Sequence, residues 1–443
     1  MKKIFTLFLV LAIITASLAG CGEKSLLSPD NPVTLTMWHV YGEQADSPMN
    51  LMIKEFNETV GKEKGVTISV TNVSSTSKIA LQLKDALDAV PGAPEMPDIF
   101  SCHTTGAVIL GTENLVDWNG YFTEEELAGY VPEFIDDGIM DDRLVVFPVS
   151  KSTYALFING SQFERFSADT GVTYDNLSTW DGFFDAAARY YEWSGGKTFC
   201  AFDYLIRHVE FDMMAANGDI EYTEDGWYNM SDPAVRESWM KFAEPLAQGH
   251  IAVADLYANT QVMTGDALAG IGSTAAIAYY NDTVTYPDNT TEPTNLKVLP
   301  LPLTGSGGKE YMPQTGVGLA AYKTNEQKAE AASVFFRWFT EGQRNLDFVA
   351  ETGYMPVNNQ AFEAIGTYQF ADEGYASLYN AISTMRQTCT AVVRPDFEGY
   401  YDKVDALYNA LRQCQTELKQ RCDNGEDPAA VAEETWSILC SVR

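Results

Sequence analysis

Residues that could support catalysis or metal binding occur in this chain, but not in the spacings that such chemistry requires. The four histidines are His39, His103, His208 and His250, and they lie far apart along the sequence. A zinc site built on histidine or cysteine uses ligands at short, regular spacings. We therefore expect no metal site of this kind.

The acidic and glycine-rich motifs also lack the features of an active site. Asp136 and Asp137 are adjacent, as are Asp141 and Asp142, whereas a glycosidase holds its two carboxylates apart across a cleft. The segment GSGGK at 305–309 has the glycines of a phosphate-binding loop, but it lacks the loop's spacing and the Ser or Thr after Lys. The sequence thus predicts a protein that is not an enzyme and that needs no cofactor.

The first 32 residues have the pattern of an export signal followed by a spacer. Two lysines precede an apolar run at residues 4–16, which is shorter than the roughly 20 residues that a membrane span needs. The motif LAGC at 18–21 resembles the bacterial lipobox, in which the cysteine becomes the lipidated N-terminus. We expect a signal peptide at 1–20, lipidation at Cys21 and a polar tether at 21–32, which holds the protein on the outer face of the cell membrane.

Six further cysteines leave two interpretations open. They are Cys102, Cys200, Cys389, Cys414, Cys422 and Cys440. An even number in an exported protein permits disulfides, but this density is too low for a disulfide scaffold. Either the thiols are buried and reduced, or one or two bridges form, most readily among Cys414, Cys422 and Cys440.

Length and charge narrow the class of protein. A mature chain of this length is too long for one ordinary core, so we expect two domains. The formal net charge of -32 argues against nucleic acid or anionic lipid headgroups as partners. It also provides no long-range attraction for an anionic ligand.

The elements that must position any site alternate between strand and helix. Strand patterns begin at Val33 and lie at 66–73 and 96–102, with apolar helical stripes between them. This βαβαβ order predicts a parallel sheet covered by helices. Further helices are predicted at 180–193, 204–217, 233–249 and, as two long helices, at 402–440.

An ordered set of motifs carries a resemblance to a known family. In chain order they are LTMWHVYG (35–42), PDIF (97–100), FPVSKSTYALFIN (147–159), GVGLAAYKTN (316–325) and ETGYMPVN (351–358). Together with the lipobox, this set resembles the family 1 extracellular solute-binding proteins, the lipoprotein receptors of bacterial ABC importers for sugars. The segments TGYMPV and TGVGLAAY look most like the branch that contains glycerol-3-phosphate and oligosaccharide receptors.

The resemblance implies an α/β fold of the periplasmic-binding-protein type, class II, with two lobes and three crossovers between them. Mapped onto this chain, one lobe comprises 33–150 and 318–357, and the other comprises 151–317 and 358–443. The resemblance further implies a monomer that binds a carbohydrate between the lobes and passes it to the permease subunits of an ABC transporter. Closure around the ligand would be a hinge motion.

A bound sugar needs aromatic rings for its C–H faces and polar groups for its hydroxyls. Open α/β sheets bind ligands at the carboxyl ends of their strands, where Ser101 and Cys102 also lie. On these grounds and on the crossovers, the predicted ligand-binding residues are Trp38, Tyr41, Glu43, His103, Ser152, Thr153, Tyr154, Asp203, Tyr204, Trp227, Ser273, Thr274, Gly316, Tyr354 and Arg394. For each aromatic residue among them, burial in the core is the alternative. Trp227 lies in a loop rich in Gly and Asp, so exposure on the surface is a further alternative for it.

Two other functions stay open at this point. A receptor for glycerol-3-phosphate or another polyol phosphate would need a basic cleft, which Arg394 and Lys151 could supply. A surface glycoside hydrolase would need a convergent pair of carboxylates.

Overall fold

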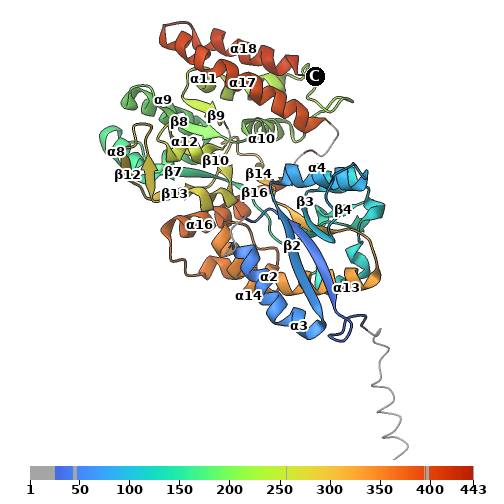
Figure 1. Cartoon of the computed structure of the whole chain (residues 1–443). Coiled ribbons are helices and arrows are strands. Elements are labelled where there is room, and N and C mark those ends of the chain that lie inside the picture. Colours follow the sequence, from blue (N-terminus) through green and yellow to red (C-terminus); the bar gives the residue numbers. More distant parts are fainter. Residues whose placement is uncertain (1–24, 43–46, 256, 394, 396–398, 443) are drawn as a thin grey trace, which may run out of the picture.

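The computed structural model contains two five-stranded sheets, and Figure 1 shows how the helices surround them. The structure describes residues 25–42, 47–255, 257–393, 395 and 399–442. We call the sheet of order β2-β1-β3-β15-β6, with the elements packed on it, the first lobe. The sheet of order β13-β7-β10-β8-β9, with its own elements, is the second lobe.

The sheet of the first lobe contains the predicted βαβαβ unit. Its strands are β1 (Val33–His39), β2 (Val66–Val73), β3 (Ile99–Cys102), β6 (Phe147–Pro148) and β15 (Gly318–Ala321). β1 pairs in parallel with both β2 and β3, as predicted, and β15 runs antiparallel to β3. The connecting helices are α2 (Pro48–Glu58) and α4 (Thr76–Leu87). Met49, Ile53 and Phe56 form the buried stripe of α2, at the spacing of one helix face.

The sheet of the second lobe is covered on both faces. Its strands are β7 (Tyr154–Asn159), β8 (Thr198–Phe202), β9 (Ile251–Val253), β10 (Ala267–Ser273) and β13 (Leu296–Leu299). Every residue of β7 is buried, the pattern of a central strand between helices. Helices α9 (Trp180–Ser194) and α16 (Glu373–Thr388) pack against β8 and β13 respectively.

The other elements extend the two lobes. The helices are α3 (Val60–Lys64), α5 (Thr104–Leu110), α6 (Glu124–Leu127), α7 (Pro132–Asp136), α8 (Gly160–Thr170), α10 (Leu205–Asn217), α11 (Pro233–Ala247), α12 (Ala258–Met263), α13 (Glu326–Phe339), α14 (Gly342–Thr352), α15 (Asn359–Ala364), α17 (Tyr400–Asp423) and α18 (Pro428–Ser441). Short strands are β4 (Ile139–Met140), β5 (Arg143–Leu144), β11 (Thr283–Thr285), β12 (Thr291–Pro293), β14 (Glu310–Gln314) and β16 (Cys389–Val393). None of the helices in the described part of the chain is long and apolar enough to cross a membrane.

The chain passes between the two sheets through backbone segments that pair with one another. Ser152 and Thr315 exchange two N–H···O=C bonds of 2.9 Å, and the N–H of Met355 donates to Lys151 O at 2.5 Å. Gly316 has a φ of +93°, and a Cβ there would lie 2.9 Å from the nitrogen of Ser152. Glycine is therefore required by both the backbone conformation and the close approach. These contacts lie where the resemblance predicts the crossovers, while the lobe boundaries themselves remain a prediction.

Part of the predicted tether is packed against the first lobe. Ser25 Oγ and the N–H of Leu26 both donate to the carboxylate of Glu330 on α13, at 2.6 and 2.9 Å. Leu27 is buried in the core, and Gln327 donates to Asn31 O at 3.1 Å. Any free spacer would therefore lie before Ser25. The predicted signal peptide and Cys21 lie outside the described residues.

The six cysteines of the body are free thiols in this structure. Cys102 and Cys200 are buried, and Cys440 is exposed. The sequence left open either reduced thiols or one or two disulfides. The structure contains reduced thiols and no bridge among the described cysteines.

Candidate functional site

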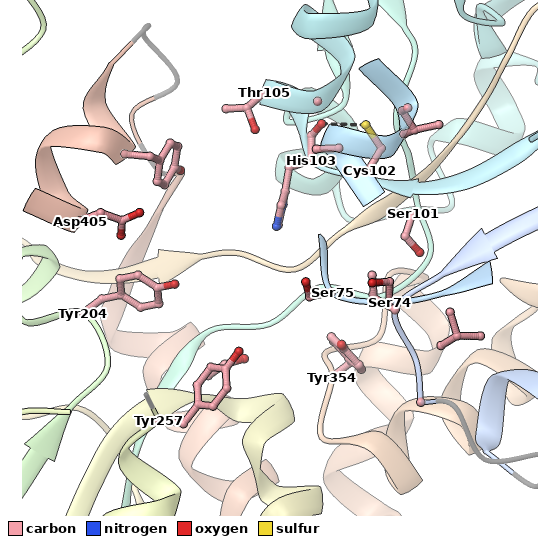
Figure 2. A pocket seen from close by; sticks show the side chains of 18 of the residues that line it. Ser74, Ser75, Ser101, Cys102, His103, Thr105, Tyr204, Tyr257, Tyr354 and Asp405 are labelled. Atoms are coloured by element: carbon pink, nitrogen blue, oxygen red, sulfur yellow. Dashed lines mark hydrogen bonds between the residues drawn. The ribbon is translucent and has the colours of Figure 1, made fainter. Parts of the chain in front are cut away.

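A cavity of about 890 Å³ lies between the two lobes (Figure 2). Its volume falls in the range of small-molecule binding sites. The wall is formed where β1, β2 and β3 of the first lobe and β8 and β10 of the second lobe reach their carboxyl ends. This is the edge at which open α/β sheets bind ligands. The described residues of the wall are Val40, Gly42, Val73, Ser74, Ser75, Ala80, Leu83, Ser101, Cys102, His103, Thr105, Gly106, Tyr204, Tyr257, Ser273, Tyr279, Tyr354, Tyr401, Val404 and Asp405.

The wall of the first lobe is rich in hydroxyl groups. Ser74 and Ser75 follow β2 directly, and Ser101 lies within β3. His103 follows β3 at the start of α5, and Figure 2 shows its ring directed into the cavity, with Thr105 beside it. Hydroxyls and imidazole nitrogens can both donate and accept hydrogen bonds. This wall is suited to a ligand that carries many hydroxyls.

The thiol of Cys102 is buried at the cavity wall and is hydrogen-bonded. Its Sγ donates to the backbone carbonyl of His103 at 2.9 Å (Figure 2). Burial raises the pKa of the thiol to about 12. The thiolate is the reactive form of cysteine, and this burial disfavours it.

Tyrosines dominate the wall of the second lobe. Tyr204 ends the segment between β8 and α10, Tyr257 precedes α12, and Tyr279 ends a 3-10 turn after β10. Their exposed fractions are 36, 54 and 66 %, which is high for such large apolar rings. Rings held open in a cavity offer flat apolar faces together with a hydroxyl.

Two predicted tyrosines support the cavity from behind. The ring of Tyr41 packs edge to face on that of Tyr354, at 5.6 Å between centroids, and its hydroxyl pairs with Ser150 Oγ at 2.8 Å. Tyr154 stacks in parallel on Tyr204, with centroids 6.0 Å apart. Tyr41 and Tyr154 are both buried. They fix the orientation of the tyrosines that line the cavity.

Asp203 fixes the backbone next to Tyr257. The N–H of Ala258, the first residue of α12, donates to Asp203 Oδ1 at 2.6 Å. Burial raises the pKa of this carboxyl to about 6, and the Ala258 N–H opposes that rise. A carboxylate that accepts from a helix N-terminus stabilises the start of that helix. Asp203 therefore holds the position of Tyr257 without lining the cavity itself.

Few charged side chains lie in or beside the described wall of the cavity. Asp405 on α17 faces the cavity opposite His103 (Figure 2), and desolvation raises the pKa of its carboxyl above the usual value. Lys151 lines a smaller adjoining pocket of about 30 Å³. There its buried ammonium group is paired with the carboxylate of Asp137. The lysine charge is thus balanced within the protein.

The structure brings some of the predicted ligand-binding residues together and places others behind the wall. His103, Tyr204, Ser273 and Tyr354 line the main cavity, and Gly316 lines the adjoining pocket. The predicted residues that do not line either are Trp38, Tyr41, Ser152, Thr153, Tyr154, Asp203, Trp227 and Thr274. Glu43 and Arg394 lie outside the described residues.

The two tryptophans in that second group belong to the cores. Trp38 is 2 % exposed, packs with Phe100 on β3, and donates through Nε1 to Thr71 Oγ1 at 3.0 Å. Trp227 is buried beside Tyr228 in the core of the second lobe. For both, the structure shows the alternative of burial that the sequence left open.

Ser152, Thr153 and Thr274 hold backbone in place behind the wall. All three are buried. The N–H of Thr274 donates to Thr153 O at 2.8 Å, and Ser152 pairs with Thr315 as described above. Their proximity to the cavity comes from the pairing of strands at the crossovers.

Sequence reasoning did not name several residues of the wall. They are Ser74, Ser75, Thr105, Tyr257, Tyr279, Tyr401 and Asp405, besides smaller apolar residues. Ser74 and Ser75 could have been found, because they follow a predicted strand at its carboxyl end. Tyr401 and Asp405 carry no such signal, since they come from a helix near the end of the chain.

Solved structures share this fold at low sequence identity. One is the cyclic alpha-maltosyl-1,6-maltose binding protein from Arthrobacter globiformis, with 18% identity and a TM-score of 0.66 over 92% of this chain and 99% of that chain. Another is UgpB from Mycobacterium tuberculosis in complex with glycerophosphocholine, with 15% identity and a TM-score of 0.65 over 93% and 98%. A third is the GacH receptor of Streptomyces glaucescens GLA.O, solved unliganded and with acarbose, with 17% identity and a TM-score of 0.64 over 93% and 100%.

The sequence itself matches a family profile. A search of curated proteins found no significant match. The profile described as bacterial extracellular solute-binding protein matches residues 52–373, well over half of the chain. Together with the two-lobe fold and the cavity between the lobes, this match assigns the chain: it belongs to the bacterial extracellular solute-binding protein family.

Proposed function

We propose that this protein binds a neutral sugar or oligosaccharide in the cavity between its lobes and delivers it to the permease of an ABC importer. The observation that carries this proposal is the composition of the cavity wall. Exposed tyrosine rings from the second lobe face serine, threonine and histidine side chains from the first lobe. Rings match the C–H faces of a sugar, and the polar groups match its hydroxyls.

The relatives in fold support the same class of ligand. Similar solved structures include a maltose-bound protein, a substrate-binding protein in complex with cycloalternan and a chitin oligosaccharide binding protein. The volume of about 890 Å³ leaves room for more than one sugar ring, which favours an oligosaccharide. Binding without turnover is the simplest role for this wall, since Asp405 is its one described carboxylate and glycosidases use two.

A polyol phosphate is the second candidate. It is favoured by the similarity to UgpB in complex with glycerophosphocholine. Lys151 lines the adjoining pocket, where its pairing with Asp137 satisfies its charge. A phosphate would have to compete with that carboxylate, so we rank this candidate behind a neutral sugar.

Lipid anchoring at Cys21 is also part of the proposal. Two acyl chains on the N-terminal cysteine would hold the receptor at the membrane. Ser25 and Leu26 are hydrogen-bonded to Glu330 on the first lobe. Only three residues would therefore separate the lipidated Cys21 from Ser25. Their contour length is on the order of 10–15 Å, so the first lobe would stay close to the membrane surface.

Ligand-dependent melting of residues 22–443 tests the proposed function. The panel contains maltotriose, triacetylchitotriose, glucose, glycerol-3-phosphate and glycerophosphocholine. A ligand present at 100 times its Kd adds about 2.7 kcal/mol to the free energy of unfolding. A shift with a neutral sugar that is recovered intact supports the proposal. A shift with the phosphates alone favours the second candidate, and sugar that is consumed points to a hydrolase.

A further inference from the structure

A buried ion pair lies on α10, the helix that follows the cavity residue Tyr204 and packs beside α17. Arg207 and Glu210 lie one turn apart on α10, are 3 and 0 % exposed, and are paired with each other. The Nη2 group of Arg207 donates to Val393 O, the last residue of β16, at 3.1 Å. Burying an ion pair costs desolvation free energy that apolar packing does not. Its net effect on stability therefore depends on the additional hydrogen bonds that the two groups form.

Glu210 binds two tyrosine hydroxyls through one oxygen. Tyr400, the first residue of α17, and Tyr228, on the loop between α10 and α11, each donate to Glu210 Oε1 at 2.6 Å. Hydrogen bonds to a buried carboxylate are among the stronger ones in proteins. The start of α17 is thereby tied to the interior of α10.

A second contact ties the same two helices together. The backbone N–H of Ile206 donates to the hydroxyl of Tyr408 at 3.0 Å. Tyr400, Val404 and Tyr408 are spaced four residues apart and are all buried, so they form the face of α17 that packs inward. Tyr401 and Asp405, one position further along the helix, line the cavity together with Val404, which lies at the edge of both faces.

We infer that Glu210 and Arg207 are positioning residues for ligand binding, acting through the Tyr400 hydroxyl on the orientation of Tyr401 and Asp405. Tyr204, which precedes α10, belongs to the same unit, because its ring lies 6.2 Å from that of Tyr408. The inference rests on the proposed function of the cavity. Neither Glu210 nor Arg207 lines the cavity, so their effect on affinity is indirect, and the Tyr400 hydroxyl on α17 is the route that the inference names.

The chain offers a matched pair of variants to test this. Tyr400→Phe and Tyr228→Phe each remove one hydroxyl from the same oxygen of Glu210 and keep the aromatic ring. Tyr228 does not line the cavity and is not part of α17. The two variants should therefore lower Tm by similar amounts. Only Tyr400→Phe should raise the Kd for maltotriose or triacetylchitotriose, by about fivefold or more.

Hydrogen exchange provides a readout that needs no ligand. Tyr400→Phe should speed exchange of the amides of residues 403–408 relative to Tyr228→Phe. The inference is overturned if both variants lose affinity equally, or if Tyr400→Phe leaves affinity and exchange at wild-type values. If the wild-type protein binds neither sugar, the proposed function fails, and the exchange rates alone decide whether the Tyr400 hydroxyl orders α17.

Discussion

Replacing Trp38 by alanine should destabilise the protein rather than only weaken ligand binding. The ring is 2 % exposed and packs among Ile79, Leu83 and Phe100. Its Nε1 group donates to Thr71 Oγ1 at 3.0 Å, and that partner would be left without the indole. Removal of a fully buried tryptophan costs about 3–5 kcal/mol.

This cost can be converted into a melting shift. For domains of the size of these lobes, each kcal/mol lowers Tm by about 2–4 °C, so Trp38→Ala should melt roughly 10 °C below the wild type. Thermal unfolding followed by circular dichroism measures this, with Trp38→Phe as a control that keeps part of the packing. A Trp38→Ala protein that melts like the wild type but no longer binds sugar would refute the placement of this ring in the core.

Three further predictions test the site. Tyr279→Ala should leave Tm within about 1–2 °C of the wild type, because the ring is 66 % exposed, and should raise the Kd for a bound sugar; unchanged affinity in a titration would remove this ring from the site. Asp203→Asn should gain stability relative to the wild type as pH rises from 4 to 6. The pKa of the Asp203 carboxyl is raised to about 6, so protonation of Asp203 stabilises the folded state. Roughly 2–3 kcal/mol of the free energy of unfolding is lost as pH rises from 4 to 6. Urea unfolding of both proteins at pH 4 and 7 measures this loss, and parallel pH profiles of the two proteins would contradict it. Gly316→Ala should cost about 1–3 kcal/mol, since φ is +93° and the Cβ would lie 2.9 Å from the nitrogen of Ser152; a variant as stable as the wild type would show that the crossover adjusts freely.

The fold was predictable because the signals for it are local and repeated. The alternation of strand and helix in the first hundred residues gives the parallel order of β1, β2 and β3. The stripe that includes Val404, Leu407 and Leu411 gives α17, whose positions are buried as expected. Periodicity reports burial at each position, and burial determines which face of an element packs inward.

The site was predictable only in part. The rule that ligands bind at the carboxyl ends of strands led to His103, Tyr204 and Ser273, which line the cavity. It could not separate the last residue that faces the cavity from the residue behind it. Trp38 lies inside β1, two residues before the wall residue Val40, and is buried in the core. The rule points to the end of a strand and does not say which residue reaches beyond the core.

Residues that reach the site from distant parts of the chain escaped prediction. Asp405 and Tyr401 lie on α17, which Tyr400 and Tyr408 tie to α10, 190 and 202 residues earlier in the sequence. Long-range hydrogen bonds of this kind leave no periodic signal. Tyr257 depends in the same way on the contact between Asp203 and the backbone of Ala258.

Titration calorimetry of the purified protein with neutral oligosaccharides, followed by mass spectrometry of the recovered sugar, tests the central claim most directly. The account predicts binding of one molecule per chain, with the sugar recovered unchanged and with affinity reduced in Tyr279→Ala. Binding of glycerol-3-phosphate but of no neutral sugar, or steady loss of the intact oligosaccharide, would contradict it.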